Sequence, residues 1–245
     1  MKPSCQSEIF VEMEQTNFQA QRLYNWAALA GFLDQWNVSL SEEKKKQIES
    51  YLNLVAYHDL EAGLTADISP QNLLLRHASD ALVCLPILKR IQNNIASDQI
   101  LRVADLGSGA GFIGIVIKIA FPEINMTLIE PLKRRFDFLN LALIALGLKE
   151  IHLIKKPIRA SQEPFLFDII IERAVAPLEK AAKIAEPLLR PKGFFIAYQS
   201  QNSGDKPISA NNAEPALPLE IKEKLNYRLP VDDKNRYLII CQRGD

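Results

Sequence analysis

A cluster of glycines follows an apolar run near the middle of the chain. The run Ile100–Leu106 carries Asp105 near its end, and the residues after the cluster predict a helix. Glycines let the backbone turn sharply and let a ligand contact the main chain, and a strand that leads into such a turn borders the usual ligand crevice of an open α/β sheet. We therefore expect a ligand to bind at the four glycines Gly107, Gly109, Gly111 and Gly114.

Two classes of cofactor compete for this crevice. Gly109–Gly114 matches the spacing of a dinucleotide fingerprint, and Glu130 lies 19 residues after Gly111, where a ribose-binding acid belongs. Asp105 disfavours a dinucleotide, because a carboxylate beside a pyrophosphate would repel it. S-adenosylmethionine carries no phosphate, and its sulfonium and ammonium groups are attracted by a carboxylate. The residues thus favour S-adenosylmethionine, with a nicotinamide or flavin nucleotide and a ligand-free structural turn as the alternatives.

The elements that must position these residues alternate between strands and helices. Such alternation indicates βαβ units and a mainly parallel sheet with helices on both faces. The polar residues 200–218 predict a loop, after which two strands form a closing antiparallel hairpin. The predicted strands are 100–106, 126–129, 152–154, 167–171, 193–198, 227–231 and 236–241, and the predicted helices are 112–121, 133–146 and 178–189.

The first third of the chain predicts helices. Residues 18–33 are rich in Ala, Leu and aromatic side chains, and Ser39 or Ser41 caps a second helix. Ser69 followed by Pro70 starts a further helix.

Pro86 is expected to kink or end this last helix. The change in pattern after it divides the chain into a helical extension, 1–96, which packs on the sheet, and an α/β domain, 97–245.

The composition is that of an ordinary globular protein. The 245 residues carry no formal net charge, 24% are charged and 48% are hydrophobic, which excludes a disordered tail, a collagen-like fibre and a supercharged nucleic-acid arm. Neutrality is an average over unlike parts: residues 1–75 hold 10 Asp and Glu against 5 Lys and Arg, whereas residues 89–192 hold 16 Lys and Arg against 11 Asp and Glu. An anionic partner is therefore expected at the middle of the chain.

Targeting and redox features are sparse. The chain begins with polar and acidic residues rather than a signal peptide, and no apolar run is long enough to span a bilayer. Cys5, Cys84 and Cys241 are too few and too scattered for a disulfide framework or a metal cage. We expect a cytoplasmic protein without membrane or metal partners.

Several motifs together resemble one known family, the small-subunit ribosomal RNA methyltransferase G family, also called glucose-inhibited division protein B. Their order and spacing hold from about residue 29 to 200. The glycine motif alone is typical of a wider superfamily, but its combination with Arg-His-x-x-Asp is quite specific. The motifs are Asn72–Asp80 with Arg76 and His77, Ala104–Gly114, Thr127–Arg134 with Phe138 and Leu139, Phe167–Asp168, and Arg173–Ala174.

This resemblance implies a Rossmann-like, class I S-adenosylmethionine-dependent methyltransferase fold, with a mainly parallel seven-stranded sheet and an N-terminal helical extension. Residues 97–245 would be the methyltransferase domain. The implied reaction is methylation of a guanine N7 in 16S ribosomal RNA, and the implied partner is that RNA, the small ribosomal subunit or its assembly intermediate, with the enzyme as a monomer. By the same resemblance, Gly107 and Phe112 line the cofactor pocket, Ile158 and Arg159 hold the adenine, and Arg173 lies beside the reactive methyl group.

The residues after the fourth predicted strand agree with an N7 acceptor. Ile171–Val175 contains neither an Asn/Asp-Pro-Pro-Tyr loop for an exocyclic amine nor a cysteine nucleophile. Guanine N7 has an in-plane lone pair and no proton to lose, so alignment and exclusion of water suffice. Arg173 fits the acceptor edge of guanine, although an arginine at this place can instead pair with a carboxylate.

Two further groups of charged residues are candidate RNA contacts. Arg76, His77 and Asp80 share one helix face, so Asp80 can pair with either neighbour. This group is expected to form a buried polar clamp between the extension and the sheet, or to contact RNA through Arg76. Lys133 and Arg134 open the helix after the second strand and are expected to contact the RNA backbone, with solvated surface as the alternative.

Some positions depart from the family's pattern, and most of them lie on the acceptor side. The serine expected after Asp80 is Ala81, the serine expected before Arg173 is Glu172, and a Lys-Gly pair is replaced by Tyr198 and Gln199. These departures leave two alternatives open. One is a class I methyltransferase with a different acceptor, and the other is a weakly active or non-catalytic relative that binds the cofactor and the ribosome.

Overall fold

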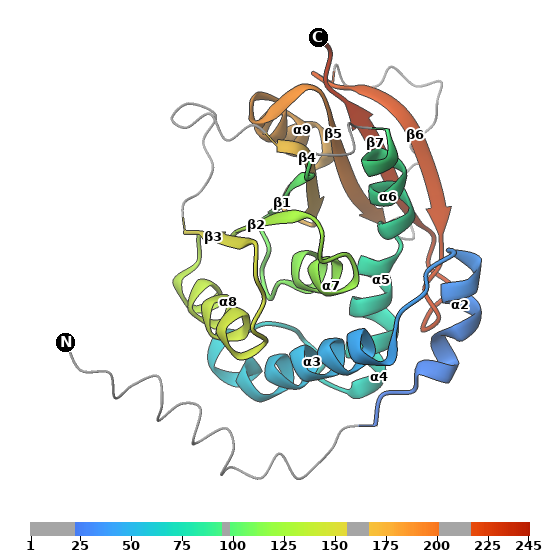
Figure 1. Ribbon diagram of the computed structural model, residues 1–245, viewed down its shortest axis with the longest axis vertical. Helices are drawn as coiled ribbons and strands as arrows, with labels where there is room; N and C mark the ends of the chain where they lie inside the picture. Colours follow the sequence, from blue (N-terminus) through green and yellow to red (C-terminus); the bar gives the residue numbers. More distant parts are fainter. Residues whose placement is uncertain (1–22, 95–98, 156–166, 201–216) are drawn as a thin grey trace, which may run out of the picture.

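The computed structural model describes residues 23–94, 99–155, 167–200 and 217–245 (Figure 1). Its centre is a seven-stranded sheet with the order β3-β2-β1-β4-β5-β7-β6. The first five strands pair in parallel, and β7 runs antiparallel to both β5 and β6. This confirms the predicted sheet. The strands are β1 (Arg102–Leu106), β2 (Asn125–Ile129), β3 (Ile151–Ile154), β4 (Phe167–Arg173), β5 (Leu189–Ser200), β6 (Glu220–Tyr227) and β7 (Arg236–Gln242).

Helices cover both faces of the sheet. Successive side chains along each strand point to opposite faces, so each face carries its own hydrophobic cluster. One cluster joins α7, α8 and the helices that precede β1 to one face. The other joins α9 to the opposite face. The helices are η1 (Trp26–Leu29), α2 (Ala30–Gln35), α3 (Glu42–Ala62), α4 (Pro70–Asn72), η2 (Leu73–Ala78), α5 (Ser79–Leu82), α6 (Leu85–Asn93), α7 (Phe112–Ala120), α8 (Lys133–Ala145), α9 (Leu178–Ala185) and η3 (Glu186–Leu188).

The long helix α3 braces the glycine loop. Ser41 caps its first turn by accepting a hydrogen bond from the backbone of Lys44, and Gly63 ends it in a left-handed conformation. Figure 1 shows α3 against α7 on the side away from the sheet. The hydroxyl of the fully buried Tyr51 donates to the carbonyl oxygen of Ala110 at 2.8 Å. A residue of the helical segment therefore fixes the backbone that follows β1.

The predicted helix after Ser69 is broken into pieces. Its middle, Leu73–Ala78, is a π-helical turn, and residues 83 and 84 separate α5 from α6. Pro86 stands in the first turn of α6, where its missing N–H is not needed. The break predicted from Pro86 is therefore present, but this proline starts the following helix rather than ending the preceding one.

Two other predictions differ from the structure or lie partly outside it. Of the predicted helix 18–33, the described residues contain only η1 and α2. Its first part lies outside the described residues, as does most of the predicted loop 200–218. The strand predicted at 227–231 was wrong, because β6 ends at Tyr227. Its outward positions are polar, and three of them, Glu220, Lys222 and Lys224, are charged, as is common for an edge strand. The apolar content of this strand is therefore too low to be recognised in the sequence.

Asp80 joins the helical segment to the sheet. Its buried carboxylate accepts hydrogen bonds from Arg173 Nη1 on β4 at 2.8 Å and from the Tyr227 hydroxyl on β6 at 2.5 Å. The expected clamp is present, but the expected partners were wrong. Arg76 pairs instead with Asp232, at 3.4 Å. A π turn bonds residues five apart, so the i, i+4 spacing of an α-helix does not hold between Arg76 and Asp80.

This clamp predicts graded losses of stability. Tyr227→Phe should lower the free energy of unfolding by about 1–2 kcal/mol, because one buried hydrogen bond is lost. Asp80→Ala should lower it by more, about 3 kcal/mol, because both hydrogen bonds are lost and the guanidinium of Arg173, three quarters buried, is left without a partner charge. Urea unfolding followed by circular dichroism measures both. Lys222→Ala, which breaks an exposed ion pair with Glu220, is the control with little expected change; equal losses in all three variants would contradict the ranking.

Candidate functional site

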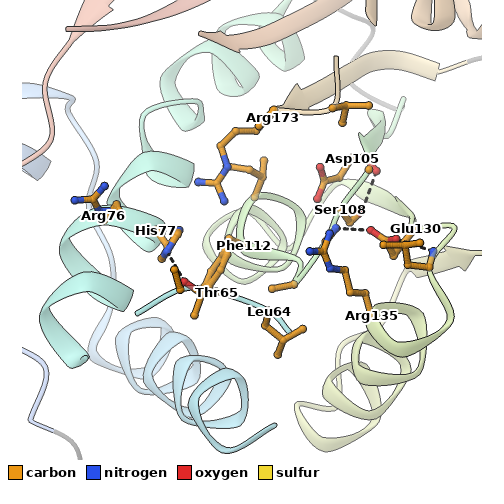
Figure 2. Close-up of a pocket in the computed structure, with 18 of the residues that line it drawn as sticks. Leu64, Thr65, Arg76, His77, Asp105, Ser108, Phe112, Glu130, Arg135 and Arg173 are labelled. Atoms are coloured by element: carbon orange, nitrogen blue, oxygen red, sulfur yellow. Dashed lines mark hydrogen bonds between the residues drawn. The ribbon is translucent and has the colours of Figure 1, made fainter. Parts of the chain in front are cut away.

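A cavity of about 920 Å³ opens at the carboxyl ends of β1, β2 and β4, where the strand order reverses direction. Its size is at the upper end of the range for small-molecule sites. Figure 2 shows Asp105, Glu130 and Arg135 on one side of the cavity, His77 and Thr65 on the other, and Arg173 extending toward His77. The lining residues are Leu64, Thr65, Ala66, Asp67, Asn72, Arg76, His77, Asp105, Gly107, Ser108, Gly109, Ala110, Phe112, Ile113, Glu130, Pro131, Leu132, Arg135, Arg173, Ala174 and Val175.

Asp105 places a buried carboxylate at the base of the cavity. It lies on β1, and its Oδ2 accepts a hydrogen bond from the backbone N–H of Gly114 at 3.0 Å. Burial raises the pKa of this carboxyl to about 6, although the Gly114 N–H and the nearby Arg173 oppose the shift. A cationic ligand group would reinforce the ionised form, so Asp105 can hold such a group.

The glycine loop needs glycine for two different reasons. Gly107 has φ +69°, and a Cβ on it would lie 2.5 Å from Cγ2 of Val175, so it allows the turn after β4 to approach the loop. Gly111 has φ +87°, and a Cβ there would meet Leu139 at 2.7 Å. Gly107 and Gly109 line the cavity as predicted, whereas Gly111 shapes the start of α7 and is not part of the wall.

Glu130 closes the loop from the side of β2. Its Oε2 accepts from the backbone N–H of Gly109 and its Oε1 from that of Leu132, both at 2.8 Å. The carboxylate is 2% exposed and faces the cavity. Because each carboxylate oxygen has two lone pairs, Glu130 can still accept hydrogen bonds from a hydroxyl-bearing ligand.

Phe112 and His77 form an aromatic wall between the carboxylates and the helical segment. Their rings stack with centroids 4.0 Å apart and planes at 8°. His77 Nε2 lies 3.2 Å from the hydroxyl of Thr65. Burial, and secondarily Arg173 and Arg76, lower the pKa of His77 to about 3. The imidazole is therefore neutral at physiological pH and supplies neither a cation nor a strong base.

Arg173 belongs both to the clamp and to the cavity wall. It uses Nη1 to bind Asp80, and its Cζ lies 5.8 Å from the centroid of the Phe112 ring. The alternative expected from the sequence, pairing with a carboxylate, is thus realised. A guanidinium has five N–H donors, so the contact with Asp80 leaves others for a ligand in the cavity.

The candidate RNA contacts do not gather at one place. Arg76 lines the cavity, whereas Lys133 is exposed and pairs with Asp137 at 2.5 Å. Arg134 borders a second cavity of about 270 Å³ between α3 and α8. Arg135, the third cation of this run, lines the main cavity and donates to the carbonyl oxygen of Gly63 at 3.4 Å.

Some residues of the cavity wall were not predicted from the sequence, and two predicted site residues lie outside the described residues. The sequence did not identify Leu64–Asp67 as cavity wall; a signal was present in Gly63, because a glycine after a helix marks a turn. There Asp59 Oδ1 accepts from the backbone N–H groups of Leu64 and Thr65. The expected adenine-binding residues Ile158 and Arg159 lie outside the described residues.

Two kinds of feature are absent from the described parts of the chain. These parts contain no group of three or more His, Cys, Asp or Glu side chains arranged to hold a metal ion. No helix among them is long and apolar enough to cross a membrane.

Comparisons with known proteins agree on one family. The profile of GidB, described as rRNA small subunit methyltransferase G, matches residues 44–227. The chain is 31% identical to a protein of Streptococcus agalactiae named ribosomal RNA small subunit methyltransferase G, over 85% of this chain and 87% of that one. It is 29% identical to a Streptococcus pneumoniae protein of the same name, over 86% and 88% of the two chains.

Among solved structures, a putative transferase of Pyrococcus horikoshii superposes with a TM-score of 0.50, covering 72% of this chain and 65% of that one. At 14% sequence identity this likeness concerns the fold alone. The sheet order with its antiparallel β7, the cavity at the ends of β1 and β2, and the match over three quarters of the sequence support one assignment. The chain has the class I methyltransferase fold and belongs to the GidB family of rRNA small subunit methyltransferases G.

Proposed function

We propose that this protein transfers a methyl group from S-adenosylmethionine to N7 of a guanine in 16S ribosomal RNA. The observation that carries the proposal is the pair of buried carboxylates, Asp105 and Glu130, on either side of the glycine loop in a chain of this family. The proposal includes a monomeric enzyme in the cytoplasm, acting on the RNA or on a small ribosomal subunit or its precursor.

The residues of the cavity fit this cofactor. Asp105 offers a negative charge to its sulfonium and ammonium groups, and Glu130 offers free lone pairs to its ribose hydroxyls. Gly107 and Gly109 leave the backbone open to contact, and Phe112 adds an apolar wall. When bound, the cofactor supplies an electrophilic methyl carbon; the chain's part is to orient that carbon and exclude water.

The acceptor side needs a positioned base and no proton acceptor. Guanine N7 has an unshared electron pair in the ring plane, and Arg173 can donate to the adjacent O6 while N7 faces the methyl group. A neutral His77 agrees with a reaction that requires no general base. Arg76 at the cavity and Lys133 and Arg134 on α8 would contact phosphates along the bound RNA.

The direct test is mass spectrometry of 16S ribosomal RNA from cells with and without this protein. We expect 7-methylguanosine at one position to disappear without the protein and to return when it is supplied again. Purified protein with labelled S-adenosylmethionine should restore the same nucleoside in RNA from the deleted cells. An unchanged nucleoside profile would remove the N7 proposal, and loss of a different methylated nucleoside would favour a different acceptor.

Asp105 should make cofactor binding depend on pH. Its carboxylate is ionised above a pKa of about 6, so affinity for a cationic ligand should fall as pH drops through that value. Between pH 7.5 and 5.5 the dissociation constant should rise about fourfold, following the fraction of ionised carboxylate. Asp105→Asn should bind at least about tenfold more weakly and lose this dependence. Calorimetry measures both, with Asp137→Asn on the exposed surface of α8 as control; an unchanged pH dependence in Asp105→Asn would refute the role.

A test of Arg173 must not leave the buried carboxylate of Asp80 without a partner. In an Asp80→Asn background, Arg173→Ala removes the guanidinium and leaves no buried carboxylate unpaired. Relative to Asp80→Asn alone, we expect kcat for RNA methylation to fall by about 10²–10³, as for loss of an oriented donor, with unchanged cofactor affinity. Arg190→Ala, which breaks an ion pair with Asp168 remote from the cavity, is the matched control. Equal turnover in the single and double variants, with Asp80→Asn as active as the unaltered protein, would show that Arg173 serves only the clamp.

A further inference from the structure

The turn that leaves β4 is held in an unfavourable backbone conformation at the cavity wall. Ala174 has φ +59°, in the left-handed region that is unfavourable for a residue with a Cβ. Both Ala174 and Val175 line the cavity. Strain of this kind persists where neighbouring contacts impose it, and such places cluster at functional sites. The contacts that impose it here start from Glu172.

Glu172 binds the turn from within the sheet. Its side chain is fully buried, and its Oε2 accepts a hydrogen bond from the backbone N–H of Val175 at 3.1 Å. Its Oε1 accepts from the amide of Gln199 on β5, at 3.4 Å. The two strands are parallel neighbours, with Arg173 opposite Tyr198. Two of the positions that depart from the family's pattern, Glu172 and Gln199, thus contact each other.

Stability does not explain a carboxyl group at this place. Both partners of Glu172, a backbone N–H and a side-chain amide, are uncharged, and Asp105 lies near enough to oppose its ionisation. Burial raises the pKa of Glu172 to about 7. A buried acid with neutral partners is costly for the folded state compared with an uncharged side chain. The geometry of the turn is what this group maintains.

Val175 links the turn to the glycine loop through a side-chain contact. Its side chain is 40% exposed in the cavity, and its Cγ2 occupies the place beside Gly107 where a Cβ would otherwise stand. Arg173, at the other end of the turn, lines the same cavity, and its guanidinium lies above Phe112 (Figure 2). Displacement of the Val175 backbone would therefore move both the contact with the glycine loop and the donor that faces the acceptor.

We infer that Glu172, supported by Gln199, is a positioning residue for methyl transfer. It fixes the turn Arg173–Val175 between the cofactor loop and the acceptor side of the cavity, and it does so without touching either substrate. The inference rests on the proposed function, because it concerns the step at which the acceptor base is aligned.

Four variants separate this role from a structural one. Glu172→Ala removes the acceptor for the Val175 N–H. Glu172→Gln keeps an acceptor oxygen and removes the charge, and its own amide can face Gln199 after that side chain rotates. Gln199→Ala removes the support alone. Glu179→Ala, on the exposed face of α9 where it breaks an ion pair with Lys183, is the control for loss of a carboxylate.

Five quantities are measured for each variant: the rate of amide hydrogen exchange, the melting temperature, kcat, KM for RNA and the cofactor dissociation constant. For Glu172→Ala we expect about tenfold faster exchange at 174–176 only, and a melting temperature unchanged or raised. We expect kcat to fall at least about tenfold with the cofactor dissociation constant nearly unchanged. Glu172→Gln should recover kcat to within about threefold, and Gln199→Ala should lie between the two.

Several outcomes would overturn the inference. They are an undiminished kcat in Glu172→Ala, a Glu172→Gln variant as impaired as Glu172→Ala, or a lowered melting temperature with faster exchange throughout β4 and β5. Should Glu172→Ala fail to fold, an unchanged kcat in Gln199→Ala is decisive against it. Amide exchange is measured without methyl transfer. A wild-type protein that is inactive on RNA would therefore contradict the proposed function, whereas the exchange rates would still test whether Glu172 holds the turn in place.

Discussion

The pairing of Asp80 with Arg173 is the contact on which the site depends. Asp80 comes from a short helix before the sheet begins, and Arg173 ends a central strand. The Asp80 side chain is only 8% exposed, whereas that of Arg173 is 25% exposed at the cavity wall, so removal of Arg173 would leave a buried carboxylate without its partner charge. Since Arg173 also forms cavity wall, the same interaction that closes the helical segment onto the sheet sets the position of a cation beside the cofactor loop.

Buried acids serve two purposes around this cavity. Asp80 and Glu172 are turned inward and hold protein groups in place, whereas Asp105 and Glu130 keep lone pairs available at the wall. Burial raises the pKa of both Asp105 and Glu172, but by the geometry only Asp105 can recover that cost through a bound cation. A site for a cationic ligand is in this sense less stable empty than filled.

Local patterns were enough to predict the parallel part of the sheet and the glycine loop. The strands at 126–129 and 167–171 are apolar except for one polar residue in each, Thr127 and Asp168, and the glycines with Asp105 define a turn by residue type alone. What the sequence could not supply were contacts between distant residues. The sequence predicted that Asp80 pairs with its helix neighbours, but its partners in the structure, Arg173 and Tyr227, lie 93 and 147 residues away. The roles of Glu172 and Val175 likewise depend on the register between β4 and β5 and on the approach of the turn to Gly107, neither of which is visible in a linear pattern.

The link from Asp80 to Tyr227 has a consequence for the order of folding. It spans most of the chain, and its far end sits on the outermost strand, which pairs only with β7. Contacts of such long sequence separation form late, because the closure of large loops must precede them. On a chain growing from its N-terminus, the glycine loop can be complete while Asp80, already paired with Arg173, still lacks the hydrogen bond that the Tyr227 hydroxyl donates to it. The acceptor side of the cavity would then be the last part of the protein to become rigid.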